Sequence, residues 1–97
     1  MLTGKERSNL KAMANDLQPI FQVGKGGITQ NLVEDLSNAL EAKELVKVTI
    51  LKAVGQTGRE IIDELAKAVR AEAVSAVGNK VVLYRYSRKE NIKHLEF

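Results

Sequence analysis

A glycine-rich segment, Gly24-Lys25-Gly26-Gly27, carries the clearest chemical signal in the sequence. Glycine has no Cβ, so the backbone of this segment can come within contact distance of another molecule. Lys25 adds a mobile positive charge at the tip. A helical pattern begins just after the segment, at Thr29, and a helix N-terminus presents free N–H groups and the positive end of its dipole. Together these features predict a site for a phosphate or a phosphodiester backbone.

Two nucleotide-binding motifs do not fit this segment. A P-loop needs Ser or Thr directly after its lysine, whereas Lys25 is followed by Gly26. The dinucleotide fingerprint needs glycine at position 29, which is Thr29. The pattern that fits is G-x-x-G leading into a helix, with which KH domains clamp a nucleic-acid backbone. The alternative is a tight strand-to-helix turn that binds nothing; the lysine at the tip favours phosphate contact.

Charge is segregated along the chain, which has a net charge of +3. Basic residues gather towards both ends, and acidic residues make the second predicted helix acidic. Such a distribution is expected if one surface meets a polyanion and another faces solvent. A second glycine-containing turn, Gly55–Gly58, precedes Arg59. Candidate binding residues beyond the loop are Lys5, Arg7, Lys11 and Arg59; solvated surface charges are the alternative.

Aromatic residues are few, with two Tyr, two Phe and no Trp. Tyr84 and Tyr86 alternate along the last predicted strand, where aromatic rings could stack on bases. Core positions are favoured instead for Phe21 and for at least one of the tyrosines. The single histidine, His94, cannot form a metal site or a catalytic triad alone, and the chain has no cysteine. We therefore expect no enzyme activity, no metal and no cofactor.

Periodicity and capping signals predict seven elements. The first predicted helix follows Thr3 and ends before Pro19, the second runs from Thr29 to about Lys43, and the third begins at Thr57. The predicted strands are Ile20–Val23, Leu45–Leu51, Ala73–Val77 and Lys80–Tyr86, the last two joined by a Gly78-Asn79 turn.

The resulting order, αβαβαββ, predicts a two-layer α/β sandwich. Strand–helix–strand units favour parallel neighbours, and the final hairpin is antiparallel, so a four-stranded mixed sheet is expected, with the helices mainly on one face. Ninety-seven residues are expected to form a single domain, 1–97, with residues 87–97 as a charged, frayed tail. The sequence contains no apolar stretch of membrane-spanning length, and its lack of cysteine fits a cytoplasmic location.

Several of these segments together closely resemble the CRM domain, named for chloroplast RNA splicing and ribosome maturation, in its bacterial single-domain YhbY type. The resemblance covers essentially the whole chain. It is carried by Leu2–Lys5, Ile20–Thr29 with its glycine loop, Glu44–Val48, Gly78–Lys80 and Val82–Arg85. It implies a fold similar to the C-terminal domain of bacterial translation initiation factor three. It also implies RNA binding through Gly24, Lys25, Gly26 and Gly27, and association with precursors of the large ribosomal subunit.

The resulting expectation is a monomeric RNA-binding protein that acts in assembly of the large ribosomal subunit. Its partner would be ribosomal RNA, with no membrane and no small-molecule substrate. Thr29 would complete the loop by starting the helix whose N–H groups face the RNA. The alternative is a protein-interaction module that docks on a ribosomal protein or on a translation-associated GTPase.

Overall fold

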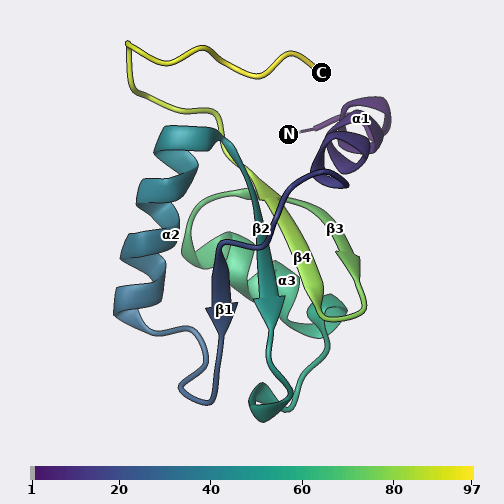
Figure 1. Ribbon diagram of the computed structural model, residues 1–97, viewed down its shortest axis with the longest axis vertical. Helices are drawn as coiled ribbons and strands as arrows, with labels where there is room; N and C mark the ends of the chain where they lie inside the picture. The colour runs from purple at the N-terminus through teal and green to yellow at the C-terminus, as the bar shows by residue number, and fades with distance from the viewer. Residues whose placement is uncertain (1) are drawn as a thin grey trace.

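Three α-helices and four β-strands follow one another in the order αβαβαββ in the computed structural model, which describes residues 2–97 (Figure 1). The helices are α1 (Gly4–Ala14), α2 (Gln30–Lys43) and α3 (Gly58–Ala68). The strands are β1 (Phe21–Val23), β2 (Leu45–Ile50), β3 (Glu72–Val77) and β4 (Lys80–Tyr84), with a short 3-10 helix, η1 (Lys52–Val54), after β2. The predicted element order is confirmed. Among residues 2–97, no helix is long and apolar enough to cross a bilayer.

The strands form one mixed sheet in the order β1-β2-β4-β3. β2 pairs in parallel with β1, with Val23 opposite Ile50, and antiparallel with β4, with Thr49 opposite Lys80. β3 and β4 form the hairpin predicted from the Gly78-Asn79 pair. The mixed sheet is therefore confirmed, and its two central strands are β2 and β4.

Alternation along the strands divides the core between the two faces of the sheet. On one face, strand residues such as Val48 and Leu83 pack with α2 and α3. On the other face, Val82 packs with Leu10 of α1 and with C-terminal residues. The sandwich of α2 and α3 on the sheet is the predicted arrangement, and α1 adds a partial layer on the opposite face.

A threonine caps the first turn of each helix. The Oγ1 atoms of Thr3, Thr29 and Thr57 accept the N–H group three residues later at 3.1, 3.1 and 3.2 Å. At α1 and α3, the glutamate in that position also accepts the threonine N–H, which completes the two predicted capping boxes. Local side chains thus define where all three helices begin.

Helices α2 and α3 end at charged residues with positive φ, Glu44 (φ 65°) and Arg70 (φ 55°). After α3, the N–H of Ala71 donates to the carbonyl of Ala66 at 2.8 Å, closing the last turn. Glycine is the usual residue at such a helix end. A side chain with positive φ costs about 1–2 kcal/mol, so these two positions store backbone strain.

The carboxylate of Glu44 holds the C-terminal segment against the rest of the chain. This residue is 1% exposed, and its side chain accepts the N–H groups of Ser87 at 2.7 Å and Leu95 at 2.8 Å, and Nδ1 of His94 at 2.6 Å. The structure thus differs from the frayed tail that the sequence predicts. The physical reason is that a buried acid far away in sequence supplies the acceptors for these donors.

Burial and hydrogen bonding act in opposite directions on the pKa of this carboxyl group. Burial raises the pKa of Glu44, but hydrogen bonds from Ser87, His94 and Leu95, with the charge of His94, lower it more, so the net pKa lies below its usual value. A carboxyl whose pKa is lower in the folded than in the unfolded chain stabilises the fold above the unfolded pKa, about 4.3. That contribution is lost as pH falls through the folded value.

We expect Glu44→Gln to lower the free energy of unfolding by about 1–3 kcal/mol near neutral pH, because an amide cannot accept all three donors. Urea unfolding across a pH series measures this. The difference from the unaltered protein should shrink as pH falls below about 4.3, where Glu44 takes up a proton in the unfolded chain, and should be lost below its lower folded pKa. Asp35→Asn, an exposed neutralisation on α2, is the control and should change little. A difference that stays constant with pH would contradict this role of the charge.

Two glycines in the same helical position offer a matched test of packing. A Cβ on Gly58 would lie 2.9 Å from the carbonyl oxygen of Gly78 and 3.0 Å from Cγ1 of Val81, whereas one on Gly4 would meet nothing within 4 Å. We expect Gly58→Ala to destabilise the fold by about 1–3 kcal/mol. Gly4→Ala should be neutral or stabilising by up to about 1 kcal/mol. Urea unfolding compares them, and equal effects would show that α3 does not pack tightly on the hairpin.

Candidate nucleic-acid interface

Three connections meet at one edge of the sheet, at the lower end of the molecule in Figure 1. They are the β1–α2 loop, the η1 segment that joins β2 to α3, and the β3–β4 hairpin. Backbone bonds tie them together: the N–H of Leu51 donates to Val23 at 2.9 Å, and that of Ile50 donates to Asn79 at 2.7 Å. The parallel pairing of β1 with β2 and the antiparallel pairing of β2 with β4 make this convergence unavoidable.

The β1–α2 loop is a tight turn, closed by the N–H of Gly27 donating to the carbonyl of Gly24 at 2.8 Å. Of its glycines, Gly27 alone has positive φ, 69°. A Cβ on Gly26 would press on Thr29 at 3.3 Å, but one on Gly24 would make ordinary contact with Leu51 at 3.7 Å. The fold therefore requires glycine at position 27 and does not require it at position 24.

Lys25 stands at the corner of this turn. Its side chain is exposed, and it makes no hydrogen bond or ion pair with any of residues 2–97. A lysine without a protein partner has all three of its N–H donors free for a ligand. The turn thus presents a free cation together with exposed backbone.

The N-terminus of α2 lies directly behind the turn. Thr29 caps the N–H of Leu32, and within the described chain the N–H groups of Gln30 and Asn31 have no acceptor. The first turn of α2 contains no acidic residue. The nearest carboxylate along α2 is that of Glu34, in the second turn, which accepts the side-chain amide of Gln30 at 3.3 Å. No carboxylate of the first turn therefore offsets the positive end of the helix dipole, which favours an anion here.

The N-terminus of α3 at the same edge is electrostatically different. Its first turn contains Glu60, whose carboxylate accepts the N–H of Thr57 at 2.8 Å. Hydrogen bonds from the backbone and side chain of Thr57 lower the pKa of Glu60, which keeps it ionised. A phosphate is therefore favoured at α2 over α3.

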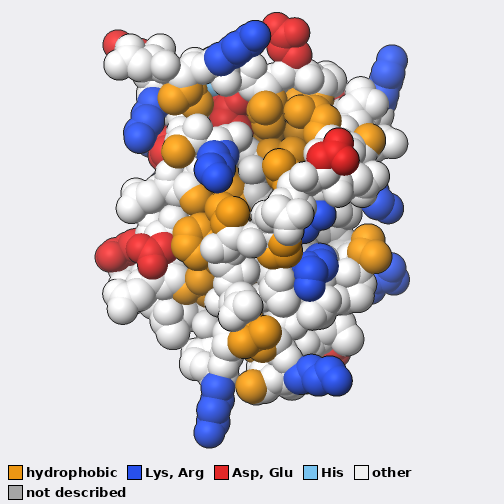
Figure 2. Space-filling view, in the orientation of Figure 1, with side chains coloured by type: hydrophobic (Ala, Val, Ile, Leu, Met, Phe, Trp, Pro, Cys, Tyr) orange, Lys and Arg blue, Asp and Glu red, His pale blue; other side chains and the backbone are white. Residues whose placement is uncertain are grey.

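Basic side chains surround the edge. Of the residues predicted from the sequence, Lys25 lies on the β1–α2 connection, Thr29 caps α2, and Arg59 is the second residue of α3, just after the η1 connection. Lys52 in η1 and Lys80 at the start of β4 join them, although sequence reasoning did not include them in the site. The pairing of β2 with β4 brings these lysines to the edge, and the hydrophobic pattern of the sequence does not reveal which strands pair. Figure 2 shows basic side chains projecting from this lower end of the molecule.

The structure does not bring Lys5, Arg7 and Lys11 to this edge. They lie on α1, which packs on the other face of the sheet and near its opposite end (Figure 1). The Nε of Arg7 donates to the carbonyl of Ala73 at 3.1 Å, far along β3 from the hairpin. The site predicted from the sequence is thus divided, and the loop is not continuous with the α1 cations.

The two tyrosines occupy different environments. Tyr84 is 7% exposed, and its ring meets that of Phe97 edge-on at 5.0 Å, so it belongs to the core. Tyr86 is 61% exposed and stacks on His94 with ring centres 4.1 Å apart. No group of three or more His, Cys, Asp or Glu residues within 2–97 is arranged to hold a metal ion.

Comparison with known proteins assigns the family. The model of the CRS1 / YhbY (CRM) domain matches residues 2–85. The chain is 44% identical over 91 residues to the "Probable RNA-binding protein YqeI" of Bacillus subtilis, covering 94% of each chain. It is 33% identical over 92 residues to an "RNA-binding protein" of Haemophilus influenzae, covering 95% of this chain and 93% of that protein.

A solved structure agrees with both the family and the fold. The solution structure of the hypothetical protein SAV1595 from Staphylococcus aureus superposes with a TM-score of 0.78 at 36% identity, covering 94% of this chain and 95% of that one. The similarity extends over nearly the full length in sequence and in three dimensions. The chain belongs to the CRS1/YhbY (CRM) domain family.

Proposed function

We propose that this protein binds RNA by gripping its sugar-phosphate backbone at the Gly24–Gly27 turn, and that it acts in assembly of the large ribosomal subunit. One observation carries the proposal: a glycine turn with an unpartnered lysine faces the N-terminus of a helix whose first turn contains no acidic residue. The names of the bacterial relatives, which are RNA-binding proteins, support the ligand class.

Each part of the turn has a role in this proposal. Gly24 and Gly26 let the RNA backbone approach, because neither has a Cβ. Lys25 neutralises a phosphate, and the free N–H groups of Gln30 and Asn31 donate to its oxygens. The glycine at position 24, which the fold itself does not require, is accounted for by this close approach.

The surrounding cations would extend the contact. Lys52 in η1, Arg59 at the start of α3 and Lys80 at the start of β4 lie at the same edge and would meet adjacent phosphates. Binding alone is sufficient for such a role, so the proposal contains no catalytic step. A role in ribosome assembly also implies action in the cytoplasm, as a monomer on the precursor particle.

The rival function is docking on a ribosomal protein or GTPase. An interface of that kind favours a contiguous apolar or aromatic patch. The exposed large apolar residues within 2–97 are dispersed over α1, the segment before β1, the end of β3 and the C-terminal segment: Met13, Ile20, Val77 and Tyr86. Their dispersal favours the RNA proposal.

We expect Lys25→Ala to weaken RNA binding several-fold without lowering the melting temperature, because its side chain is exposed and bonds to no other described residue. Fluorescence anisotropy with a large-subunit ribosomal RNA fragment, titrated at several salt concentrations, measures this. If four cations contact phosphates, log K against log salt should have a slope of about −3 to −4, and Lys25→Ala should reduce it by about 1.

Lys11→Ala is the matched control, since it removes the same charge from an exposed site on α1 away from the edge. It should change affinity much less. Equal losses from both variants would mean that net charge alone drives binding, and the turn would not be the site. A salt slope near zero would favour protein docking.

The role in assembly has its own test. We expect the tagged protein to cosediment with large-subunit precursors in a sucrose gradient of cell lysate, and the peak to disappear at high salt and in Lys25→Ala. A peak that persists under both conditions would indicate a protein contact on the particle. Absence from every ribosomal fraction would overturn the assembly role while leaving RNA binding to the anisotropy experiment.

A further inference from the structure

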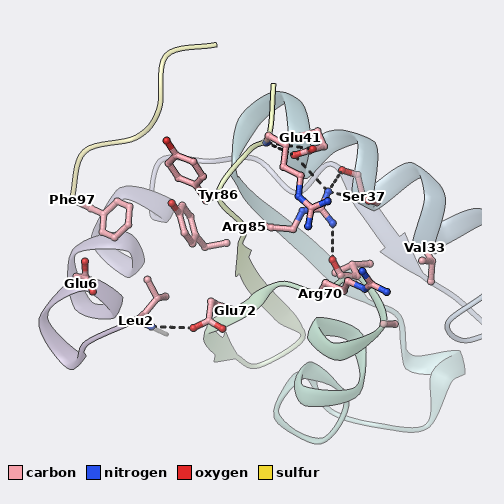
Figure 3. Close-up of a pocket in the computed structure, with 14 residues that line it drawn as sticks. Leu2, Glu6, Val33, Ser37, Glu41, Arg70, Glu72, Arg85, Tyr86 and Phe97 are labelled. Carbon is pink, nitrogen blue, oxygen red and sulfur yellow. Dashed lines mark hydrogen bonds and ion pairs between the residues drawn. The ribbon is translucent and has the colours of Figure 1, made fainter. Parts of the chain in front are cut away.

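A groove of about 790 Å³ runs along α2 on the side that faces the end of α3 and the chain after β4 (Figure 3). α2 contributes one face of side chains at four-residue spacing, Val33, Ser37 and Glu41. The opposite wall comes from the turn after α3 and from the segment that follows β4. That wall includes Arg70, Arg85, Tyr86 and Arg88.

Arg85 fixes the distance between the two walls. Its Nη1 donates to the carbonyl of Val69 at 2.7 Å, and its Nη2 donates to the carbonyl and hydroxyl of Ser37 at 2.8 and 3.0 Å. The same nitrogen lies 3.8 Å from Oε2 of Glu41 (Figure 3). Most of its donors are used within the protein, so Arg85 shapes the groove rather than serving as its free cation.

Arg70 and Arg88 are the free cations of the groove. Both side chains are exposed, and neither guanidinium makes a hydrogen bond or ion pair with any of residues 2–97. The nearby acid, Glu41, already accepts the backbone N–H of Arg88 at 3.2 Å and lies beside Arg85. Its charge is therefore largely offset, and this end of the groove favours an anion.

The remaining acids of the groove lie at its other end, beside α1. Glu6 accepts the N–H of Thr3 at 2.9 Å in the α1 capping box, and Glu72 accepts the N–H of Leu2 at 3.0 Å. The groove is thus divided by charge. The α2 end is cationic, and the α1 end is acidic and already engaged with the N-terminal segment.

Backbone strain points to the same groove. Glu44 and Arg70 are the two non-glycine residues of 2–97 with positive φ. Arg70 places its guanidinium on the groove at a helix end where glycine would relieve the strain. Glu44 holds the segment that carries Tyr86 and Arg88 in place through Ser87. A non-glycine residue at a strained position of a binding surface indicates that its side chain has a role there, because glycine would fit the backbone better.

Tyr86 supplies a rigid aromatic surface beside these arginines. Its ring is parallel to that of His94 within 12°, and His94 is in turn bonded to the buried carboxylate of Glu44 at 2.6 Å. The tyrosine is nonetheless 61% exposed. An open, immobilised ring next to arginines is the combination with which proteins hold unpaired bases of single strands.

We propose that this groove holds a single-stranded segment of the bound RNA, with a phosphate on Arg70 and Arg88 and an unpaired base stacked on Tyr86. The inference rests on the proposed function. The turn grips the RNA backbone at the N-terminus of α2, and Val33, one turn into the same helix, already lines the groove. One strand can therefore pass from the turn into the groove.

The test uses two labelled probes, a short single-stranded RNA and a blunt RNA duplex of the same length, in fluorescence anisotropy with the full chain. Tyr86→Ala should lower affinity for the single strand about five- to tenfold, and Tyr86→Phe, which keeps the ring, should not. Neither should change affinity for the duplex. The control, Lys67→Ala on exposed α3 surface outside the groove, should alter binding of both probes slightly.

Arg70→Gly separates function from folding. Because glycine suits the positive φ at this position, the variant should raise the melting temperature while it lowers single-strand affinity about three- to tenfold. Arg88→Ala should lower the affinity similarly with an unchanged melting temperature. A gain in stability with no loss of affinity would remove Arg70 from the site.

Fluorescence quenching of a base analogue distinguishes direct stacking on Tyr86 from an indirect effect of the substitution on the C-terminal segment. The fluorescent adenine analogue aminopurine, placed in the single strand, should be quenched on binding to the unaltered protein and to Tyr86→Phe, and should not be quenched by Tyr86→Ala. Quenching that survives Tyr86→Ala would overturn the base contact.

Lys25→Ala distinguishes the two proposals. If it weakens binding of both probes while the groove variants weaken neither, the groove is not an RNA site and the proposed function stands. If no variant weakens either probe, both proposals fail. If Tyr86→Ala spares RNA affinity but abolishes salt-resistant cosedimentation with ribosomal particles, the groove is a protein-docking surface, and our inference is overturned.

Discussion

The position of β2 is the constraint on which the rest of the structure depends. It is paired on both edges, parallel to β1 and antiparallel to β4, and buried on both faces. The parallel pair requires the chain to cross over through α2. The glycine turn and the η1 segment, which follow the carboxyl ends of β1 and β2, therefore lie at the same edge. The antiparallel pair brings the hairpin to that edge as well. The meeting of three loops at this candidate interface thus follows from one strand having two neighbours.

Electrostatics then distinguishes between helix ends that geometry makes equivalent. α2 and α3 both begin at this edge behind capping threonines, but Glu60 in the first turn of α3 accepts the N–H of its cap. α2 lacks any such acid and has the exposed Lys25 in front of it. Because the field of a helix end acts within its first turn, this one difference determines where an anion is most favoured.

Polar groups distant in sequence organise the opposite end of the molecule. The buried carboxylate of Glu44 satisfies three donors of the C-terminal segment, and Arg85 joins the end of α3 to the middle of α2. Within residues 2–97, no buried side-chain nitrogen or oxygen lacks a hydrogen-bond partner. Since an unpaired buried donor or charge costs so much, these two residues fix the position of the segment that carries Tyr86 and Arg88. The position of this groove wall is therefore a consequence of satisfying buried polar groups.

Interactions between residues close together in the sequence determine much of this structure. The threonine caps, the apolar periodicity and the Gly78-Asn79 turn act over a few residues, so the sequence predicts the element order and every helix start. The G-x-x-G turn before Thr29 is local in the same way, and the loop could be identified as a candidate site. These signals need no knowledge of what lies across the fold.

Only the tertiary structure decided what lies beside what. It placed Lys52 and Lys80 next to the turn and moved Lys5, Arg7 and Lys11 away from it, because α1 covers the opposite face. It also placed the carboxylate of Glu44 where it binds the C-terminal segment, which the sequence predicts to fray. Such placements depend on strand order and on pairings between residues far apart in the chain. Hydrophobic periodicity contains neither, since it records which face of an element is buried but not which element buries it.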